Sequence, residues 1–179
     1  MKNLKKFAIL FFVALSGIYF FSCNQKGEPA NTGQFVDTVK YFRHILFSET
    51  PFDDMKGNYE LTAEEAKVVN NYKFRFDDKK RPVSIEFNRG GVLLSYSSLD
   101  ASKILIEYTD STETRLYFDK DGNPKEVNGK VFKSVFSRDQ SGLRTGLKFY
   151  DKDGNPVENR NKIAYYTWSK LPDGLIKEN

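Results

Sequence analysis

One phrase of six residues occurs twice in this sequence, and it constrains the fold more than any other feature does. The phrase Asp-Lys-Asp-Gly-Asn-Pro occupies residues 119–124 and, 32 residues later, residues 151–156. The alignment continues beyond the phrase without a gap and pairs Glu126 with Glu158, Ser137 with Ser169 and Phe136 with Trp168. The sequence therefore predicts an internal repeat whose copies span 117–147 and 149–179.

Each copy of the phrase has the composition of a tight turn that follows a strand. An aromatic pair precedes it in both places, Tyr117-Phe118 and Phe149-Tyr150. The Asp side chain accepts hydrogen bonds from the local backbone, Gly adopts a positive φ without steric cost, and Asn-Pro returns the chain to an extended conformation. We expect a second strand after each turn, over 131–137 and 163–169, with an aromatic-rich face.

The same acids also suggest a calcium loop, because Asp119, Asp121 and Asn123 carry oxygen atoms at alternate positions. A calcium loop of the EF-hand type needs Gly at its sixth position and an acid at its twelfth. Here Gly is fourth and Pro is sixth. The spacing favours turn formation over a weak cation site, and we predict neither a metal nor another cofactor.

From residue 72 onward, short strand patterns alternate with turn signals. Apolar residues recur with a period of two over 72–76 and 83–87, which predicts a hairpin across 77–81. About eight short strands fit the chain at this density of turns. The fold class predicted for 72–179 is therefore mainly β, an antiparallel β-meander that forms a curled sheet or a small barrel.

The aromatic-Asp-x-x-Gly-Asn-Pro phrase resembles the YD-type, RHS-like repeat, in which a Tyr-Asp pair and a Gly turn punctuate successive β-hairpins. The resemblance is carried by Phe118-Asp119 and Tyr150-Asp151 with the turns that follow them. It implies a β-hairpin architecture and a cell-envelope or export context. It implies no catalytic residue.

The first 22 residues have the composition of a targeting segment. A basic start with three lysines leads into a nearly continuous apolar run over 7–21, and Cys23, the only cysteine, follows. This segment resembles a bacterial lipoprotein signal peptide, which implies that Cys23 becomes the lipid-modified amino terminus. An uncleaved anchor and simple secretion are the alternatives, although an apolar run of about 15 residues is shorter than the roughly 20 that a membrane span needs.

The residues after the signal predict a tether and then a helical segment. Residues 23–33 comprise the lipidated Cys and a polar, flexible tether, and Asn24, in place of Asp, favours the outer membrane over the inner one. One or two short helices are expected over 34–71. Apolar residues over 35–47 fit one helical face, although a strand is also compatible with them. The capping box Thr62-Ala-Glu-Glu65 predicts a short helix directly after it, over 63–70.

Charge and composition argue against several classes of function. The chain has 28 Lys and Arg against 24 Asp and Glu, and removal of the three signal lysines leaves 25 against 24, a net charge of +1. This balance argues against nucleic-acid binding. His44 is the only histidine, so neither a Ser-His-Asp triad nor a His-based metal site is expected. No pair of acids stands out for glycoside hydrolysis, and we predict that the protein is not an enzyme.

The function predicted is binding. The repeated hairpins and the near-neutral charge favour a lipid-anchored, non-catalytic module that binds a protein partner in the envelope or has a structural role. The alternative is a carbohydrate or small-ligand binder that uses aromatic side chains at its surface. The candidate ligand-binding residues are Tyr165, Tyr166 and Trp168. We expect Tyr165 to be exposed, whereas Tyr166 and Trp168 also fit the core of a small sheet.

Overall fold

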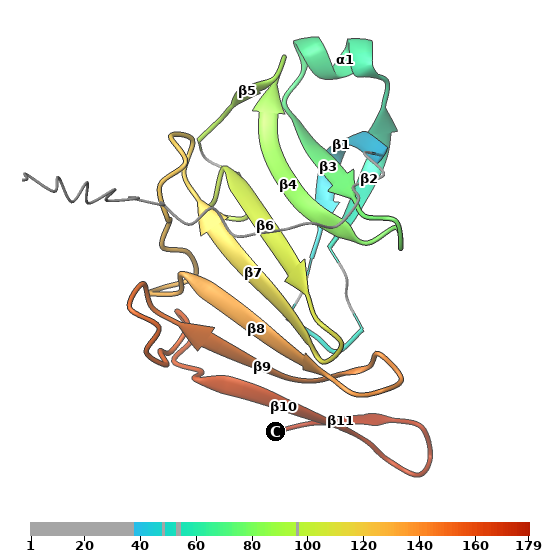
Figure 1. Ribbon diagram of the computed structural model, residues 1–179, viewed down its shortest axis with the longest axis vertical. Coiled ribbons are helices and arrows are strands. Elements are labelled where there is room, and N and C mark those ends of the chain that lie inside the picture. The colour runs from blue at the N-terminus through green and yellow to red at the C-terminus, as the bar shows by residue number, and fades with distance from the viewer. Residues whose placement is uncertain (1–37, 48, 53–54, 96) are drawn as a thin grey trace, which may run out of the picture. The chain divides into compact units, whose positions relative to one another are not determined.

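The chain folds into one open antiparallel sheet whose strands follow one another almost in sequence order (Figure 1). The computed structural model describes residues 38–47, 49–52, 55–95 and 97–179. The sheet order is β11-β10-β9-β8-β7-β6-β4-β3-β1-β2, and β5 pairs with β4. The elements are β1 (Thr38–Leu46), β2 (Lys56–Leu61), α1 (Ala63–Val68), β3 (Asn71–Phe76), β4 (Pro82–Arg89), β5 (Val92–Leu93), β6 (Lys103–Tyr108), β7 (Thr112–Phe118), β8 (Lys133–Arg138), β9 (Arg144–Tyr150), β10 (Tyr165–Lys170) and β11 (Ile176–Glu178).

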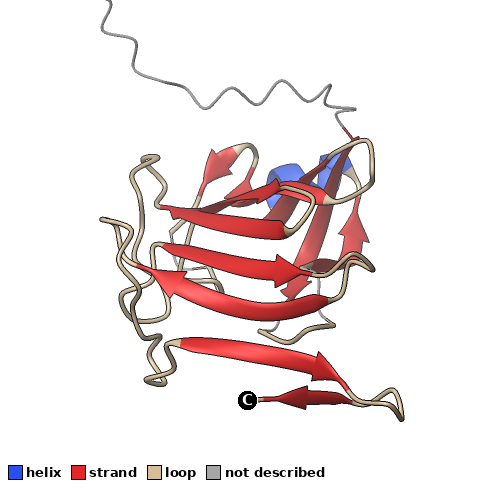
Figure 2. Ribbon diagram, turned by 60° about the horizontal axis from the view of Figure 1, so that its bottom comes forward, coloured by secondary structure: helices blue, strands red, loops and turns tan. Residues whose placement is uncertain are grey.

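The prediction of a mainly β meander is confirmed, and the sheet is not closed into a barrel. Successive hairpins turn back at both ends of the sheet, as Figure 2 shows. The hairpin expected across 77–81 is present, because β3 pairs with β4. Eleven strands form in place of about eight, because the amino-terminal segment and the last residues also add strands to the sheet. The predicted signal peptide, Cys23, the tether and residues 34–37 lie outside the described residues.

The helix expected over 35–47 is wrong for the described part of that segment, which forms β1 between β2 and β3. Phe42 pairs with Glu60 on β2 and with Tyr72 on β3. Its ring enters the core, whereas Leu46, which shares the expected helical face, is 57% exposed. Aromatic and β-branched residues suit a strand whenever the backbone finds partners on both sides. Pairing across the sheet therefore overrides the helical spacing.

The helix α1 confirms the capping box. Thr62 Oγ1 accepts a hydrogen bond from the Glu65 amide at 3.2 Å, and the Glu65 carboxylate accepts one from the Thr62 amide at 2.7 Å. The helix ends two residues earlier than expected, because Val69 is already extended with φ −120° and ψ 152°. No helix in the described ranges is long and apolar enough to cross a membrane.

The repeated phrase forms the turns that its sequence predicts. Asp119 Oδ1 accepts hydrogen bonds from the amides two and four residues later, both at 2.9 Å, and Asp151 Oδ1 accepts the same pair at 2.9 and 2.8 Å. A third turn of this kind, at Asp139, was not foreseen because its sequence lacks the Asn-Pro ending. The first carboxylate of each phrase, Asp119 or Asp151, is thus engaged by its own backbone, and the Asp121 carboxylate accepts from Lys120 Nζ.

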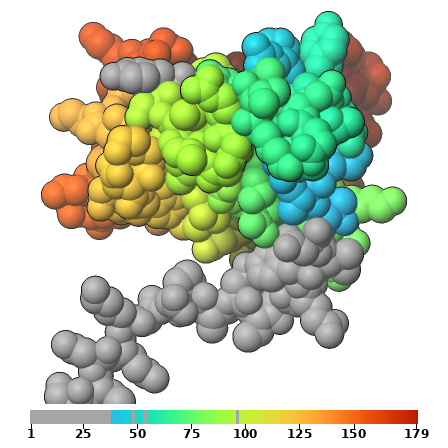
Figure 3. Space-filling view, turned by 90° about the horizontal axis from the view of Figure 1, so that it is seen from above, coloured from blue at the N-terminus to red at the C-terminus, as the bar shows by residue number. Residues whose placement is uncertain are grey.

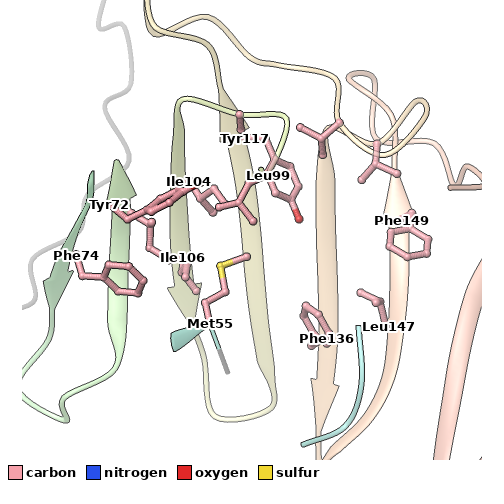
Figure 4. Close-up of a cluster of buried hydrophobic side chains, with 14 of the residues drawn as sticks. Met55, Tyr72, Phe74, Leu99, Ile104, Ile106, Tyr117, Phe136, Leu147 and Phe149 are labelled. Atoms are coloured by element: carbon pink, nitrogen blue, oxygen red, sulfur yellow. The ribbon is translucent and has the colours of Figure 1, made fainter. Parts of the chain in front are cut away.

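The core lies on one face of the sheet, where side chains from strands far apart in sequence converge (Figure 4). The segment that joins β1 to β2 contributes Met55, which is 5% exposed, to this cluster. We call this the inner face. Its fully buried apolar side chains are Phe74, Ile85, Ile104, Val131, Phe136, Leu147 and Phe149.

Candidate functional site

The connection between β1 and β2 places a carboxylate over the inner face. Glu49 accepts a hydrogen bond from Asn128 Nδ2 at 2.8 Å, and longer ones from Asn159 Nδ2 and the Tyr166 hydroxyl, each at 3.4 Å. Asn128 lies in the loop after β7, and Asn159 lies in the loop after β9. Burial raises the pKa of Glu49, and these hydrogen bonds offset the effect only in part. The carboxyl is therefore held in place at some energetic cost.

A cavity of about 280 Å³ lies beneath this connection. Such a volume is at the lower end of what small-molecule pockets usually offer. Figure 4 shows Met55, Leu99, Tyr117, Phe136 and Leu147 directed into the same interior region. The polar and charged residues that also line the cavity are Glu49, Ser98, Asp100, Arg115, Asn128, Ser134, Arg160 and Asn161. Apolar walls with a few convergent polar groups are typical of a ligand site.

A buried carboxylate, Glu113 on β7, lies behind Arg115, which lines the cavity; Glu113 is 1% exposed. Arg144 Nη2 donates to both of its oxygens at 2.9 and 2.7 Å, Arg115 Nε donates at 2.8 Å, and Arg138 also donates to it. Burial alone would raise the pKa of Glu113, but the charges of Arg115 and Arg144 and the hydrogen bonds lower it to about 2. Glu113 is therefore ionised at neutral pH and serves as an anchor for arginines.

Arg115 connects this anchor to the cavity. Its side chain is 4% exposed, its Nε and Nη2 face Glu113, and it lines the cavity wall. Its third nitrogen, Nη1, has no hydrogen bond within the described part of the chain. The guanidinium groups of Arg115 and Arg144 lie 4.4 and 4.2 Å from the centroid of the Phe136 ring. Arg115 is thus rigidly held and presents a donor to whatever occupies the cavity.

The two repeated loops meet at the rim of the cavity. The amide of Arg160 donates to the Asn128 carbonyl at 2.8 Å, and the backbone at Gly129 pairs with Asn159. Arg160 also forms an ion pair with Asp100 at 2.5 Å. The rim is therefore built from three segments that are far apart in sequence.

Substitution Gly129→Ala is expected to loosen this rim. Gly129 has φ +96°, and a Cβ there would lie 2.9 Å from the Arg160 amide nitrogen. Gly122→Ala is the matched control, because Gly122 has φ +84° but no atom within 4 Å of an added Cβ. Both variants incur about 1–2 kcal/mol from the left-handed backbone, and only Gly129→Ala adds a steric clash. Denaturant unfolding should therefore show a larger loss for Gly129→Ala; equal losses would contradict the close loop packing.

The three aromatic residues predicted to bind ligand do not form one surface. Tyr165 is 58% exposed, as expected, but it lies on the strand face opposite to Tyr166 and Trp168. Trp168 is 3% exposed and its Nε1 donates to Glu178 at 2.7 Å. Tyr166 is half-buried, stacks on Trp168 at 5.8 Å and reaches Glu49. Only Tyr166 therefore has a link to the cavity.

The sequence patterns did not predict the residues that define the cavity. Glu113 and Arg115 alternate with Thr114 and Leu116 along β7, so two charged residues share one strand face with Tyr117. Charged residues at inward strand positions are unusual unless they are paired. That alternation was the available signal for a polar site on the inner face. Nothing local marks Glu49, whose partners lie 79 to 117 residues away.

Comparisons with known proteins found no match for this chain. The sequence matches no protein-family model, and neither a curated protein nor a solved structure matches it. In the described ranges, no group of three or more His, Cys, Asp or Glu side chains is arranged to hold a metal ion.

The substitution Glu49→Gln is expected to reduce the loss of stability that the protein undergoes between acid and neutral pH. A carboxyl with a raised pKa in the folded state contributes stability below its usual pKa near 4.5, and this contribution is lost as pH rises through the folded value. Gln keeps an oxygen for the Asn128 amide and cannot ionise. Unfolding free energies at pH 4 and pH 7 should therefore fall less with rising pH in Glu49→Gln than in the wild type. Glu158→Gln, at an exposed position, should follow the wild type; identical profiles for all three proteins would contradict the role of burial.

Proposed function

We propose that the protein is a lipid-anchored, non-catalytic binding module of the cell envelope, and that its binding site is the cavity on the inner face. The observation that carries this proposal is the convergence of Glu49 and Arg115 on one cavity with aromatic and aliphatic walls. An acceptor and a donor held in fixed positions beside apolar surface recognise a small, partly polar ligand. Tyr165, which lies on the opposite strand face, does not contact the ligand in this proposal.

The same geometry favours binding over catalysis. Three arginines engage Glu113, and three side chains hold Glu49, so each carboxylate has a structural role. His44 is exposed on β1, where its ring meets Tyr59 at 5.7 Å, and it does not line the cavity. In the part of the chain that the structure describes, neither carboxylate accepts a hydrogen bond from a Ser, Thr, Cys or Lys side chain.

Ligand capture tests this proposal. The full-length protein, purified in detergent, is incubated with the small-molecule fraction of a cell-envelope extract and analysed by native mass spectrometry. We expect the wild type to retain a compound that Leu99→Trp, which fills the cavity, does not retain. Because the larger side chain of Leu99→Trp also disturbs packing, Glu49→Gln provides a second variant that keeps the volume and weakens binding. No retained mass, or equal retention by all three proteins, would refute the proposal.

Anchoring through Cys23 has its own test. Cys23→Ser removes the thiol that would carry the acyl chains, so the variant should move from the membrane fraction to the soluble fraction and lose the mass of the lipid. Unchanged membrane retention would instead mean that the apolar segment is an uncleaved anchor. Membrane fractionation with mass spectrometry of the intact protein measures both outcomes.

A protein partner is the second candidate, and the sheet edges favour it. β2 and β11 end the sheet order, and each pairs with one strand in the described part of the chain. Open edges accept an added strand from a partner. A photo-crosslinking residue in place of Tyr59, which is 69% exposed on β2, should give a defined adduct in cells, and one in place of Lys152, in an exposed turn, should not. Adducts at neither position would count against this candidate.

A further inference from the structure

A second hollow adjoins the cavity at its rim. Its volume is about 640 Å³, and its lining includes Ser95, residues from 97–102 and residues from 119–129. The two hollows share Asp100, Val127, Asn128 and Arg160. Figure 3 shows the loops after β7 and β9, in gold and orange, beside the yellow-green part of the chain around β5. We call this second hollow the outer groove.

The two hollows differ in chemistry. The cavity has aromatic and aliphatic walls with Glu49 and Arg115 among them. The outer groove is lined mainly by hydroxyl and charged side chains, including Ser95, Lys125 and Glu126. The Asp100–Arg160 ion pair stands at the boundary, and its side chains are 52% and 59% exposed. A ligand that occupied both hollows would have one compact unit with apolar surface, followed by a polar chain.

We propose that the ligand is the end of a glycan chain, with its terminal sugar in the cavity and the following sugars in the outer groove; this inference rests on the proposed small-ligand site. A sugar ring has C–H faces that pack on aromatic walls such as Phe136 and Tyr117. Its hydroxyl groups donate and accept hydrogen bonds, so they can bond both the Glu49 carboxylate and Arg115 Nη1, which has no hydrogen-bond partner among the described residues. Further sugars present hydroxyl groups to the polar groove.

The geometry favours a glycan over a peptide. A β-sheet protein commonly binds an extended peptide by pairing the peptide backbone with an unpaired strand edge. The outer groove is walled by the segments before β6 and after β7, and β6 and β7 are each already paired on both sides. Recognition there depends on side chains with hydroxyl, amine and carboxylate groups, which match a chain of hydroxyl groups.

Calorimetric titration of the full-length protein tests the inference. The probes are glucose, galactose and N-acetylglucosamine, the linear trisaccharide of each, and trialanine as the peptide. At least one trisaccharide should bind about tenfold more tightly than its monosaccharide, because the added units contact the groove. The double variant Lys125→Ala/Glu126→Ala, at two exposed positions, should abolish this difference. Lys130→Ala, also exposed and outside the groove lining, is the control and should keep the difference.

Four results would overturn the inference. Trisaccharides that bind no better than monosaccharides would remove the groove from the site, and so would a double variant that keeps the difference. Binding of trialanine in place of every sugar would assign the site to a peptide. If no sugar binds while native mass spectrometry still shows a compound that Leu99→Trp fails to retain, the glycan inference fails and the cavity function stands.

Discussion

Glu113→Gln is expected to destabilise the protein by about 3–5 kcal/mol at pH 7, because it leaves buried guanidinium groups without the carboxylate that they surround. Gln fills almost the same volume, so the loss reports the charge and not a cavity. Urea unfolding followed by tryptophan fluorescence is a suitable measurement, because Trp168 is buried in the hydrophobic core. Glu107→Gln, at an exposed position on the neighbouring strand β6, is the control and should change stability by less than about 0.5 kcal/mol.

The pH dependence separates this ion cluster from simple packing. The pKa of Glu113 is lowered from about 4.5 to about 2, so its contribution is present above pH 4.5 and is lost as pH falls through 2. A shift of this size corresponds to roughly 3 kcal/mol. The gap between the wild type and Glu113→Gln should therefore narrow between pH 4.5 and pH 2. A gap that stays constant over this range, or one below about 1 kcal/mol at pH 7, would refute the assigned role.

The second large effect is expected at Phe136, whose ring is 1% exposed and lies against Arg115, Arg144 and Trp168. Phe136→Ala should cost about 3–5 kcal/mol, since it removes a large side chain from a close-packed region. Phe136→Leu keeps much of the apolar volume but removes the ring from the two guanidinium groups. Its loss should be smaller, about 1–2 kcal/mol.

Denaturant unfolding of both Phe136 variants distinguishes packing from the ring interaction. Phe52→Ala is the control, because Phe52 is 67% exposed and its truncation should have little effect. Equal losses for the Ala and Leu variants would mean that the aromatic ring itself is what the arginines need. Losses no larger than that of Phe52→Ala would contradict the position of Phe136 in the core.

The turns were predictable from the sequence because their chemistry is local. An Asp that accepts amides two and four residues later needs only its own loop, and the same holds for the capping box of α1. The hairpin of β3 and β4 follows for a similar reason, since its period of two is bounded by turn residues. These elements appear where their sequences place them.

The amino-terminal strand and the cavity depend on partners that are distant in sequence. Residues 38–46 fit a helical face and a strand about equally, and only β2 and β3 on either side decide between them. Glu49 becomes a site residue because it meets Asn159, 110 residues away. Trp168 was a plausible surface anchor because its side chain is aromatic, but it is buried on the inner face. Long-range pairing of this kind leaves no local pattern.

The order of the strands also has a kinetic consequence. Paired strands are never more than two apart in chain order, so most of the sheet can form hairpin by hairpin with small loop-closure costs. The contacts of Glu49 and Thr50 with residues 79 to 117 positions later are different, because they join segments that are distant in chain order. The cavity beside Glu49 is therefore completed only after the loop that follows β9 has folded, and a chain interrupted directly after β9 would have most of its sheet but an incomplete cavity.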